Sequence, residues 1–212
     1  MDTRATFRKH LRDALLPAPP PGSGDPPEGQ DGRPAAVLIP VTDERNPTVV
    51  FTKRTDDLPR HAGEISFPGG LRNASDPDLL ETALRETEEE LGLPRSDIEV
   101  LGALEPFLTY TTGYWVTPFV GLLDPDHRLV PSPAEIAEVL QVPLATLDRI
   151  EREVEWHREE WTWRGFVYEV DGHTIWGATG RMLHQFLEIV RNQGIPEEGV
   201  RGTKEEPWQT PK

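Results

Sequence analysis

Four glutamates stand within five positions of residues 85–93, which read Arg-Glu-Thr-Glu-Glu-Glu-Leu-Gly-Leu. On a helix, Glu86 and Glu90 lie on the same side because they are four residues apart, and Glu89 lies one step further round. Like charges at this spacing destabilise a helix by about 0.2–0.5 kcal/mol. A hard divalent cation such as Mg²⁺ binds carboxylate and phosphate oxygens together. The spacing is compatible with metal-assisted chemistry on a phosphate group. On the glutamates alone, however, a solvated acidic helix face is the commoner explanation in a chain this acidic.

The overall composition limits the partners of such a site. The chain has 212 residues and a formal net charge of −15, so nucleic acid is not an expected partner and an anionic substrate would need cations to bind. It has no cysteine, which excludes disulfides and thiolate metal sites and favours a reducing compartment. It contains no run of 18 apolar residues and no hydrophobic segment typical of a signal peptide, so we expect a cytoplasmic protein that does not enter a membrane.

Changes in composition divide the chain into three parts. Residues 1–34 combine an amphipathic helix with a linker rich in proline and glycine. Residues 35–194 carry the strands and helices of one folded domain, and residues 195–212 are polar and expected to fray. Because strands and helices mix without strict alternation, the predicted fold class is mixed α and β (α+β).

Periodicity and turn residues predict the individual elements. Helices are expected over residues 3–16, 78–91, 143–150 and 178–191. Strands are expected over residues 35–41, 48–53, 64–67, 98–104, 115–123, 161–170 and 173–176. The helix over 78–91 should end at Gly92, because glycine readily takes the left-handed conformation of a helix C-terminus. Its apolar face is expected to carry Leu80, Leu84, Thr87 and Leu91, whereas the residues expected to point away from the core are Glu81, Arg85 and Glu88.

The region around this helix has a family resemblance. Residues 70–93 resemble the Nudix box, in which a glycine, a loop and a helix lead to Arg-Glu-(small or apolar)-x-Glu-Glu-x-Gly-(apolar), and residues 85–93 match this ending in full. The resemblance implies an α/β/α sandwich around a mixed central sheet. It also implies a hydrolase that cleaves a nucleoside diphosphate linked to another moiety, with Mg²⁺ or Mn²⁺ as the cofactor.

The resemblance also implies a role for each residue that matches the motif. Carried over by position, Glu86 and Glu90 are the main metal ligands. Glu89 is a further ligand or the catalytic base, and Arg85 orients a liganding glutamate.

The upstream half of the motif departs from the general pattern. The usual glutamate eight residues before Arg85 is replaced by Pro77, which Asp76 and Asp78 flank. The distance from Gly70 to Arg85 is also one residue longer than usual. This longer loop is similar to that of one branch of the family, the coenzyme A pyrophosphatases.

Three further segments are similar to that branch: residues 51–70, 113–120 and 175–179. The resemblance therefore covers roughly residues 36–190, well beyond one motif. One departure is that Pro59 stands where the branch usually has an arginine, and Arg60 follows immediately.

Residues next to the motif are candidates for substrate binding. Arg54 and Arg60 carry guanidinium groups whose donors match phosphate oxygens. Gly69 and Gly70 allow the backbone to approach phosphates and metal closely. His61 is a candidate phosphate donor, and its alternative role is to close the loop.

We therefore predict metal-dependent hydrolysis of coenzyme A or its thioesters to 3′,5′-ADP and 4′-phosphopantetheine. The alternatives are a Nudix hydrolase of ADP-ribose, NADH or a nucleoside triphosphate, and a non-catalytic nucleotide-binding module. The expected partner is a small nucleotide, and both a monomer and a homodimer are compatible with the sequence. Candidate bases besides Glu89 are Glu64, Glu135 and Glu138, the last two by analogy with family members that recruit a base from a distal loop.

Overall fold

The computed structural model describes residues 3–18, 26–28, 31–57, 61–124, 126–158 and 161–193. The helices are α1 (Thr3–Ala14), α2 (Leu79–Leu91), α3 (Leu144–Ile150) and α4 (Gly177–Asn192), with a 3-10 turn, η1 (Arg95–Asp97). The first strands are β1 (Arg33–Thr42), β2 (Thr48–Arg54), β3 (Ile65–Ser66), β4 (Gly69–Leu71) and β5 (Ile98–Ala103). The remaining strands are β6 (Phe107–Leu108), β7 (Tyr114–Leu123), β8 (Ile136–Pro143), β9 (Arg152–Arg158), β10 (Trp161–Val170) and β11 (His173–Ile175).

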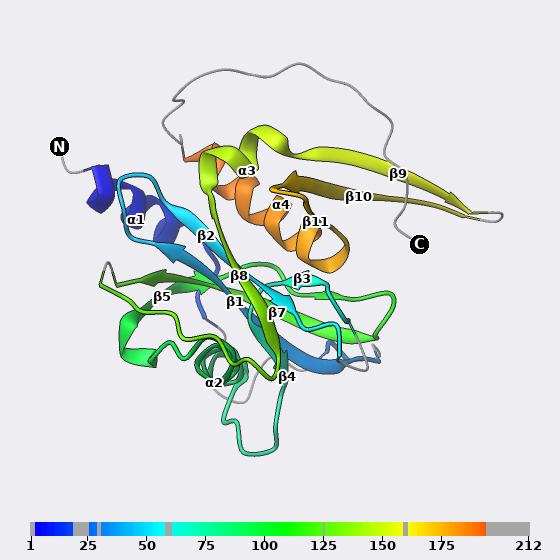
Figure 1. Cartoon of the computed structure of the whole chain (residues 1–212), viewed down its shortest axis with the longest axis horizontal. Coiled ribbons are helices and arrows are strands. Elements are labelled where there is room, and N and C mark those ends of the chain that lie inside the picture. The colour runs from blue at the N-terminus through cyan, green and yellow to red at the C-terminus, as the bar shows by residue number, and fades with distance from the viewer. Residues whose placement is uncertain are drawn as a thin grey trace.

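The main sheet is mixed and lies between two layers of helices. Its strands are ordered β3-β2-β1-β7-β5, and β8 pairs with β2. β1 and β7 are parallel along their whole length, whereas the β1–β2, β2–β8 and β5–β7 pairs are antiparallel. Figure 1 shows α2 on one side of this sheet and α3 and α4 on the other. The α/β/α sandwich implied by the resemblance is therefore the fold of the chain.

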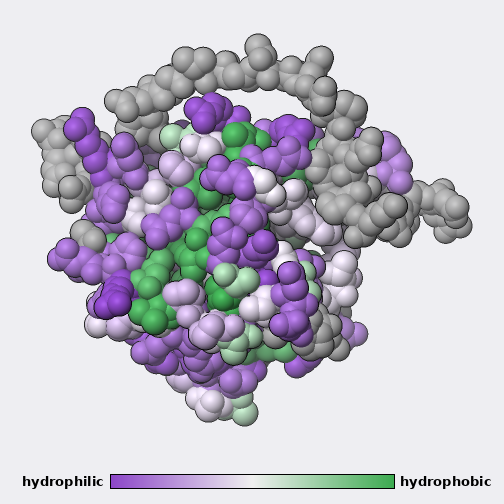
Figure 2. Space-filling model, viewed as in Figure 1, coloured by the Kyte–Doolittle hydropathy of each residue, from purple (hydrophilic) through white to green (hydrophobic). Residues whose placement is uncertain are grey.

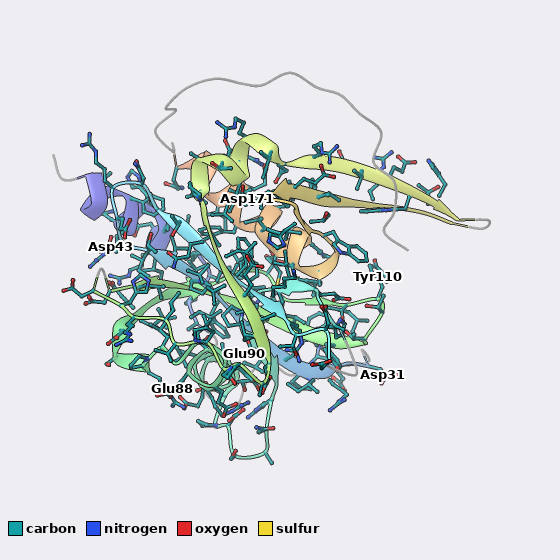
Figure 3. All side chains as sticks on the ribbon, in the orientation of Figure 1. Asp31, Asp43, Glu88, Glu90, Tyr110 and Asp171 are labelled. Atoms are coloured by element: carbon teal, nitrogen blue, oxygen red, sulfur yellow. The ribbon has the colours of Figure 1, made fainter. Side chains whose placement is uncertain are left out.

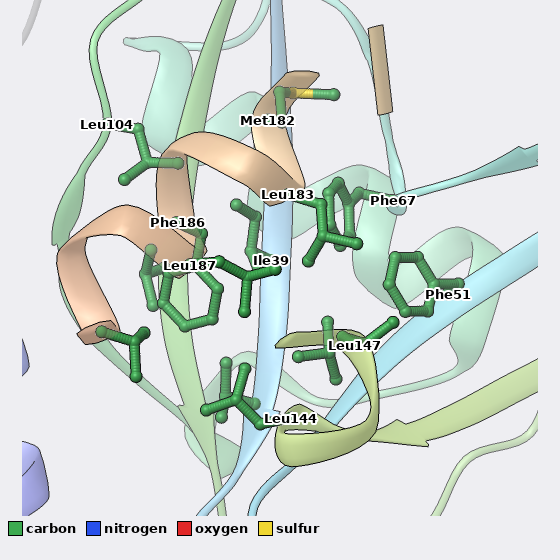
Figure 4. Close-up of a cluster of buried hydrophobic side chains, with 14 of the residues drawn as sticks. Ile39, Phe51, Phe67, Leu104, Leu144, Leu147, Met182, Leu183, Phe186 and Leu187 are labelled. Atoms are coloured by element: carbon green, nitrogen blue, oxygen red, sulfur yellow. The ribbon is translucent and has the colours of Figure 1, made fainter. Parts of the chain in front are cut away.

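β1 is the centre of this arrangement because both of its faces are buried. Leu38 packs with α2 through Leu79 and Ala83, in a cluster that also holds Phe119 of β7. The next residue, Ile39, points to the opposite face, as expected from the alternation of side chains along a strand. There it belongs to the larger cluster shown in Figure 4, which α3 and α4 complete.

The N-terminal helix is part of the same core. Leu11 of α1 and Leu15, just after its end, are buried in the cluster that α4 covers. Leu16 then forms a β-bridge with Ala103 at the end of β5. α1 therefore packs into the core of the domain, although it precedes the expected boundary at residue 34.

The predicted element boundaries mostly agree with the structure to within two residues, and the main omissions are β8 and β9. β8 forms a strand by pairing with β2. The sequence of β9 is rich in charged residues, and it forms a strand because it pairs with β10 from Arg152↔Val167 to Arg158↔Trp161. Figure 1 shows the β9–β10 hairpin extending away from the main sheet.

Glu151 connects this C-terminal part of the molecule. Its carboxylate accepts a hydrogen bond from the Tyr168 hydroxyl at 2.5 Å, lies 3.2 Å from His184 Nδ1, and pairs with Arg191 Nη1 at 3.0 Å. It thereby holds β10 and α4 at the end of α3.

On the face of the molecule shown in Figure 2, hydrophilic residues surround an apolar strip. No helix in the described ranges is long and apolar enough to cross a membrane.

Candidate active site

The orientation of α2 about its own axis decides which of its side chains can act. Asp78 begins the helix, and its side chain accepts a hydrogen bond from the Glu81 amide at 2.8 Å. Gly92 ends the helix with φ +61°, and its amide donates a hydrogen bond to the Glu88 carbonyl. The buried side chains are Leu79, Thr82, Ala83, Thr87, Glu90 and Leu91. The predicted apolar face is confirmed for Thr87 and Leu91, and Leu80 and Leu84 are partly buried and pack against the core.

Glu90 lies deep between α2 and the sheet. Its side chain is 4% exposed, whereas Glu88 points outward, and Figure 3 shows the two on opposite sides of the helix. Burial raises the pKa of Glu90 to about 8, assisted by the negative charges of Glu86 and Glu135 and opposed by Arg54 and by the Gly69 amide. A carboxylate kept at this position must be stabilised by a cation or by a proton.

Glu86 lies beside Glu90 and directly under the glycine turn. A Cβ atom on Gly70 would stand 2.6 Å from the Glu86 carboxyl carbon, so the bare backbone leaves the space that this carboxylate occupies. Burial raises the pKa of Glu86 as well, and Arg85 opposes this rise. The fold thus brings Gly70 next to the acidic helix.

Arg85 turns inward, which corrects the prediction that it points away from the core. Its Nε and Nη2 atoms donate to the two oxygens of Asp76 at 3.1 and 3.0 Å. Its Nη1 atom pairs with Glu86 Oε1 and with Glu89 Oε2, each at 2.9 Å. The bond to Asp76 is the main cause that raises the pKa of Arg85, so the guanidinium is always charged.

Glu89 is placed differently from the other two glutamates. Its side chain is 58% exposed and its carboxylate is held by Arg85. Glu86 and Glu90 therefore meet at the sheet, while Glu89 reaches the site from the solvent side.

Arg54 and the glycine turn approach Glu90 from the sheet. Arg54 ends β2, and its Nη1 atom lies 3.5 Å from Glu90 Oε1. Gly69 begins β4 opposite Val37 of β1, with φ +157°, and its amide donates to the Glu90 carboxylate. Together with Gly70, three of the predicted substrate-binding residues therefore lie at the acidic helix.

The remaining predicted binding residues lie differently. His61 has φ +57°, and its Nδ1 atom pairs with Glu64 Oε2 at 2.7 Å, which is the contact of a residue that closes the loop. Arg60 and Pro59 lie outside the described residues.

The distal loop supplies one of its two candidate glutamates. The Glu135 carbonyl accepts the Thr55 amide at 2.9 Å, next to Arg54, and the Glu135 carboxylate raises the pKa values of Glu86 and Glu90. Glu138 instead pairs with Lys53 at 3.9 Å and His173 at 3.4 Å. Its side chain is therefore tied to the other side of β2.

The residues fit a divalent cation by the chemistry of their donors. Glu90 Oε2 is buried without a hydrogen-bond partner, and Glu86 and Glu90 repel each other where water is scarce. Oxygen donors of this kind are the ligands of Mg²⁺. Within the described ranges, no three histidine, aspartate or glutamate side chains already form a closed metal-binding group.

Asp76 is the functional candidate that sequence reasoning passed over. It is buried, and besides Arg85 it accepts hydrogen bonds from the Asn73 amide at 3.0 Å and the Thr82 hydroxyl at 2.9 Å. The signal was its position beside Pro77, where the general Nudix pattern has a glutamate. Because the loop is one residue longer, the acidic residue lies nine rather than eight positions before Arg85. In the fold it still pairs with Arg85.

Comparisons with known proteins show which family the chain belongs to. The NUDIX domain family matches residues 32–163. A protein of Photorhabdus laumondii named uncharacterized Nudix hydrolase NudL is 38% identical over 181 residues, which cover 83% of this chain and 92% of the relative. A relative of the same name from Yersinia enterocolitica is 36% identical over 187 residues, covering 87% of this chain and 93% of the relative.

Solved structures are similar at lower identity. The NUDIX domain of Shewanella oneidensis NrtR, solved as a complex with ADP ribose, aligns with a TM-score of 0.48 and 17% identity over 80% of this chain and 92% of that chain. The family match and the two relatives, which extend over most of the chain, give the assignment: this protein belongs to the Nudix family and is a Nudix hydrolase.

Proposed function

We propose that this enzyme hydrolyses the pyrophosphate bond of coenzyme A or its thioesters, giving 3′,5′-ADP and 4′-phosphopantetheine. The observation that carries the proposal is the meeting of Glu86 and Glu90 beneath the Gly69–Gly70 turn. Two repelling carboxylates next to a backbone without side chains suit a metal-bridged pyrophosphate.

Glu86 and Glu90 would hold the cation, and Glu89 would add a ligand from the solvent side or act as the base. When bound there, Mg²⁺ or Mn²⁺ would withdraw charge from the pyrophosphate and lower the pKa of a coordinated water. Arg85 fixes Glu86 through Nη1, and Asp76 fixes Arg85 in turn. This chain of bonds keeps the liganding carboxylate in place.

Other side chains act on the substrate and the attacking water. Arg54 carries the donors for a phosphate oxygen beside the same carboxylate. Glu135 lies near Glu86 and Glu90 and is exposed, so it is a second candidate to remove a proton from water. Arg60 stays a proposed phosphate ligand on the sequence argument alone.

The choice of coenzyme A rests on the segments that resemble the coenzyme A branch. Two of these segments are in contact, since the Thr179 hydroxyl at the start of α4 donates to the Ile65 carbonyl of β3 at 3.1 Å. β3 leads directly into the Gly69–Gly70 turn. The segments before the motif and at α4 thus border the same end of the sheet, which supports a shared role in substrate selection.

Product analysis tests the substrate. The purified enzyme is incubated with Mg²⁺ and, in parallel, coenzyme A, acetyl-coenzyme A, NADH, ADP-ribose and a deoxynucleoside triphosphate, and the products are separated by chromatography. We expect 3′,5′-ADP from coenzyme A. Cleavage of ADP-ribose, NADH or the triphosphate with coenzyme A left intact would replace this substrate by an alternative one, and no turnover of any compound would favour a binding module.

A further inference from the structure

The ion pair between Arg54 and Glu90 is incomplete on both sides. Arg54 Nη1 lies 3.5 Å from Glu90 Oε1, whereas a well-formed arginine–carboxylate pair has two parallel bonds of about 2.7–2.9 Å. Arg54 Nε and Glu90 Oε2 are both buried without a hydrogen-bond partner. One donor and one acceptor therefore stay unsatisfied within the same pair, in surroundings where such groups are costly.

The backbone holds Arg54 at this position from both sides. The β2–β8 register shifts between Lys53 and Arg54. The Arg54 amide donates to the Glu64 carbonyl at 3.0 Å, and the next amide, of Thr55, donates to the Glu135 carbonyl at 2.9 Å. The strand is fixed, so a change of partner at Arg54 requires only a movement of its side chain.

We infer that Arg54 is a displaceable counter-ion: its guanidinium balances the buried Glu90 carboxylate in the metal-free enzyme and gives it up when a divalent cation binds. This inference rests on the proposed metal site at Glu86 and Glu90. The cation and the guanidinium compete for the same carboxylate, so each lowers the affinity of Glu90 for the other. A counter-ion that leaves when the cation binds is expected to form an incomplete pair of this kind, with a long Nη1–Oε1 distance and an Nε atom that has no partner.

Displacement also connects the metal to the substrate. Arginine keeps its charge when it leaves a carboxylate, so the released guanidinium has a free fork of donors for a phosphate oxygen. Arg54 would thus be available for the anionic substrate only when the cation is in place, which orders metal binding before productive substrate binding.

Binding of Mn²⁺ to the substrate-free protein tests the inference without any turnover. Titration calorimetry compares the native protein with Arg54→Gln and with Lys53→Gln, a matched control that removes one positive charge from the adjacent position on β2. We expect Arg54→Gln to bind Mn²⁺ about fivefold or more tightly. Lys53→Gln, whose partner is Glu138, should stay within about twofold of the native affinity. An unchanged or weaker affinity in Arg54→Gln would overturn the inference.

Two further variants make the result decisive. Arg54→Met keeps most of the side-chain length without its charge and must show the same tighter binding, which covers the case in which Arg54→Gln folds poorly. Glu90→Gln distinguishes a failure of the proposed metal site from a failure of the proposed displacement of Arg54. Native-like Mn²⁺ affinity in Glu90→Gln would refute the proposed metal site itself. Weaker binding in Glu90→Gln together with unchanged binding in both Arg54 variants would refute the displacement alone.

Discussion

The Arg85 guanidinium donates to both carboxylate oxygens of Asp76, from Nε to Oδ1 at 3.1 Å and from Nη2 to Oδ2 at 3.0 Å. The same guanidinium holds Glu86 through its remaining nitrogen, at 2.9 Å. Asp76 thus positions a proposed metal ligand without contacting it. This relationship makes Asp76 a residue whose replacement should affect both the fold and the reaction.

We expect Asp76→Asn to lower kcat about tenfold or more, because an amide cannot accept both bonds and Arg85 loses its orientation. It should also lower the free energy of unfolding by about 2–3 kcal/mol, since the partly buried Arg85 guanidinium loses the carboxylate that accepts two of its hydrogen bonds. Steady-state kinetics and urea unfolding measure the two effects. Asp126→Asn, which removes an exposed carboxylate, is the control and should behave as the native protein does. Native-like kcat in Asp76→Asn would remove its positioning role.

The stability difference between the native protein and Asp76→Asn should depend on pH. Burial alone would raise the pKa of Asp76, but bonds from Arg85, the Asn73 amide and Thr82 outweigh it and leave the pKa below its ordinary value of 3.8. A carboxylate with a lowered folded-state pKa contributes stability above its unfolded pKa and loses it as the pH falls through the folded value. The difference in the free energy of unfolding between the two proteins should therefore be constant at roughly pH 5–7 and shrink below about pH 4. Urea unfolding at pH 6 and pH 3 measures it, and an equal difference at both would contradict the charge argument.

Glu90→Gln should abolish most turnover while leaving the protein folded. Glutamine keeps the shape of the buried side chain and removes the charge, so kcat/KM should fall at least about 100-fold. In the presence of a chelator the variant should unfold at the native temperature or above it, because burial of the Glu90 charge and its repulsion by Glu86 outweigh its attraction to Arg54, as the raised pKa of Glu90 shows. Glu88→Gln, on the exposed side of α2 and paired with Arg95, is the matched control and should keep native activity. Native-like turnover in Glu90→Gln would show that our assignment of the metal site is wrong.

Glu135 and Glu138 allow a direct test of the distal base. If Glu135 accepts the proton of the attacking water, Glu135→Gln should lower kcat by about 100-fold with little change in KM. Glu138→Gln, three residues along the same segment and tied to Lys53 and His173, should not change kcat. Equal and small effects in both variants would leave Glu89 as the proposed base, and Glu89→Gln would then carry the loss.

Gly69 and Gly70 should respond differently to alanine. A Cβ on Gly70 meets only the carboxylate end of Glu86, which can move, so Gly70→Ala should fold normally but lose at least about tenfold in kcat/KM. A Cβ on Gly69 would stand 2.4 Å from the Ala36 carbonyl oxygen, and this residue has φ +157°, so Gly69→Ala should lose about 1–3 kcal/mol of stability. Thermal unfolding and kinetics of the pair separate the two roles. A strongly destabilised Gly70→Ala would contradict the placement of Glu86.

The acidic helix and the chemistry that it favours can be predicted from the amino-acid sequence. Spacing alone puts Glu86 and Glu90 on one flank, and Gly92 ends the helix in the left-handed conformation that glycine permits. The motif ending at residues 85–93 was sufficient to predict the family, because several residue types had to match at fixed positions. Local rules of this kind depend on neighbours along the chain, which the sequence displays directly.

The rotation of that helix against the sheet, and the partners of its side chains, depend on tertiary packing. Periodicity fixes the angles between side chains but not the rotation of the helix against the sheet, so the inward position of Arg85 was not predictable. Its partner Asp76 reaches it by a loop whose path depends on the Asn73 and Thr82 bonds. The Arg54–Glu90 pair joins a strand end to a helix far along the chain. Contacts of this kind form because the sheet brings together segments that are distant in the sequence. They cannot be predicted from patterns of neighbouring residues.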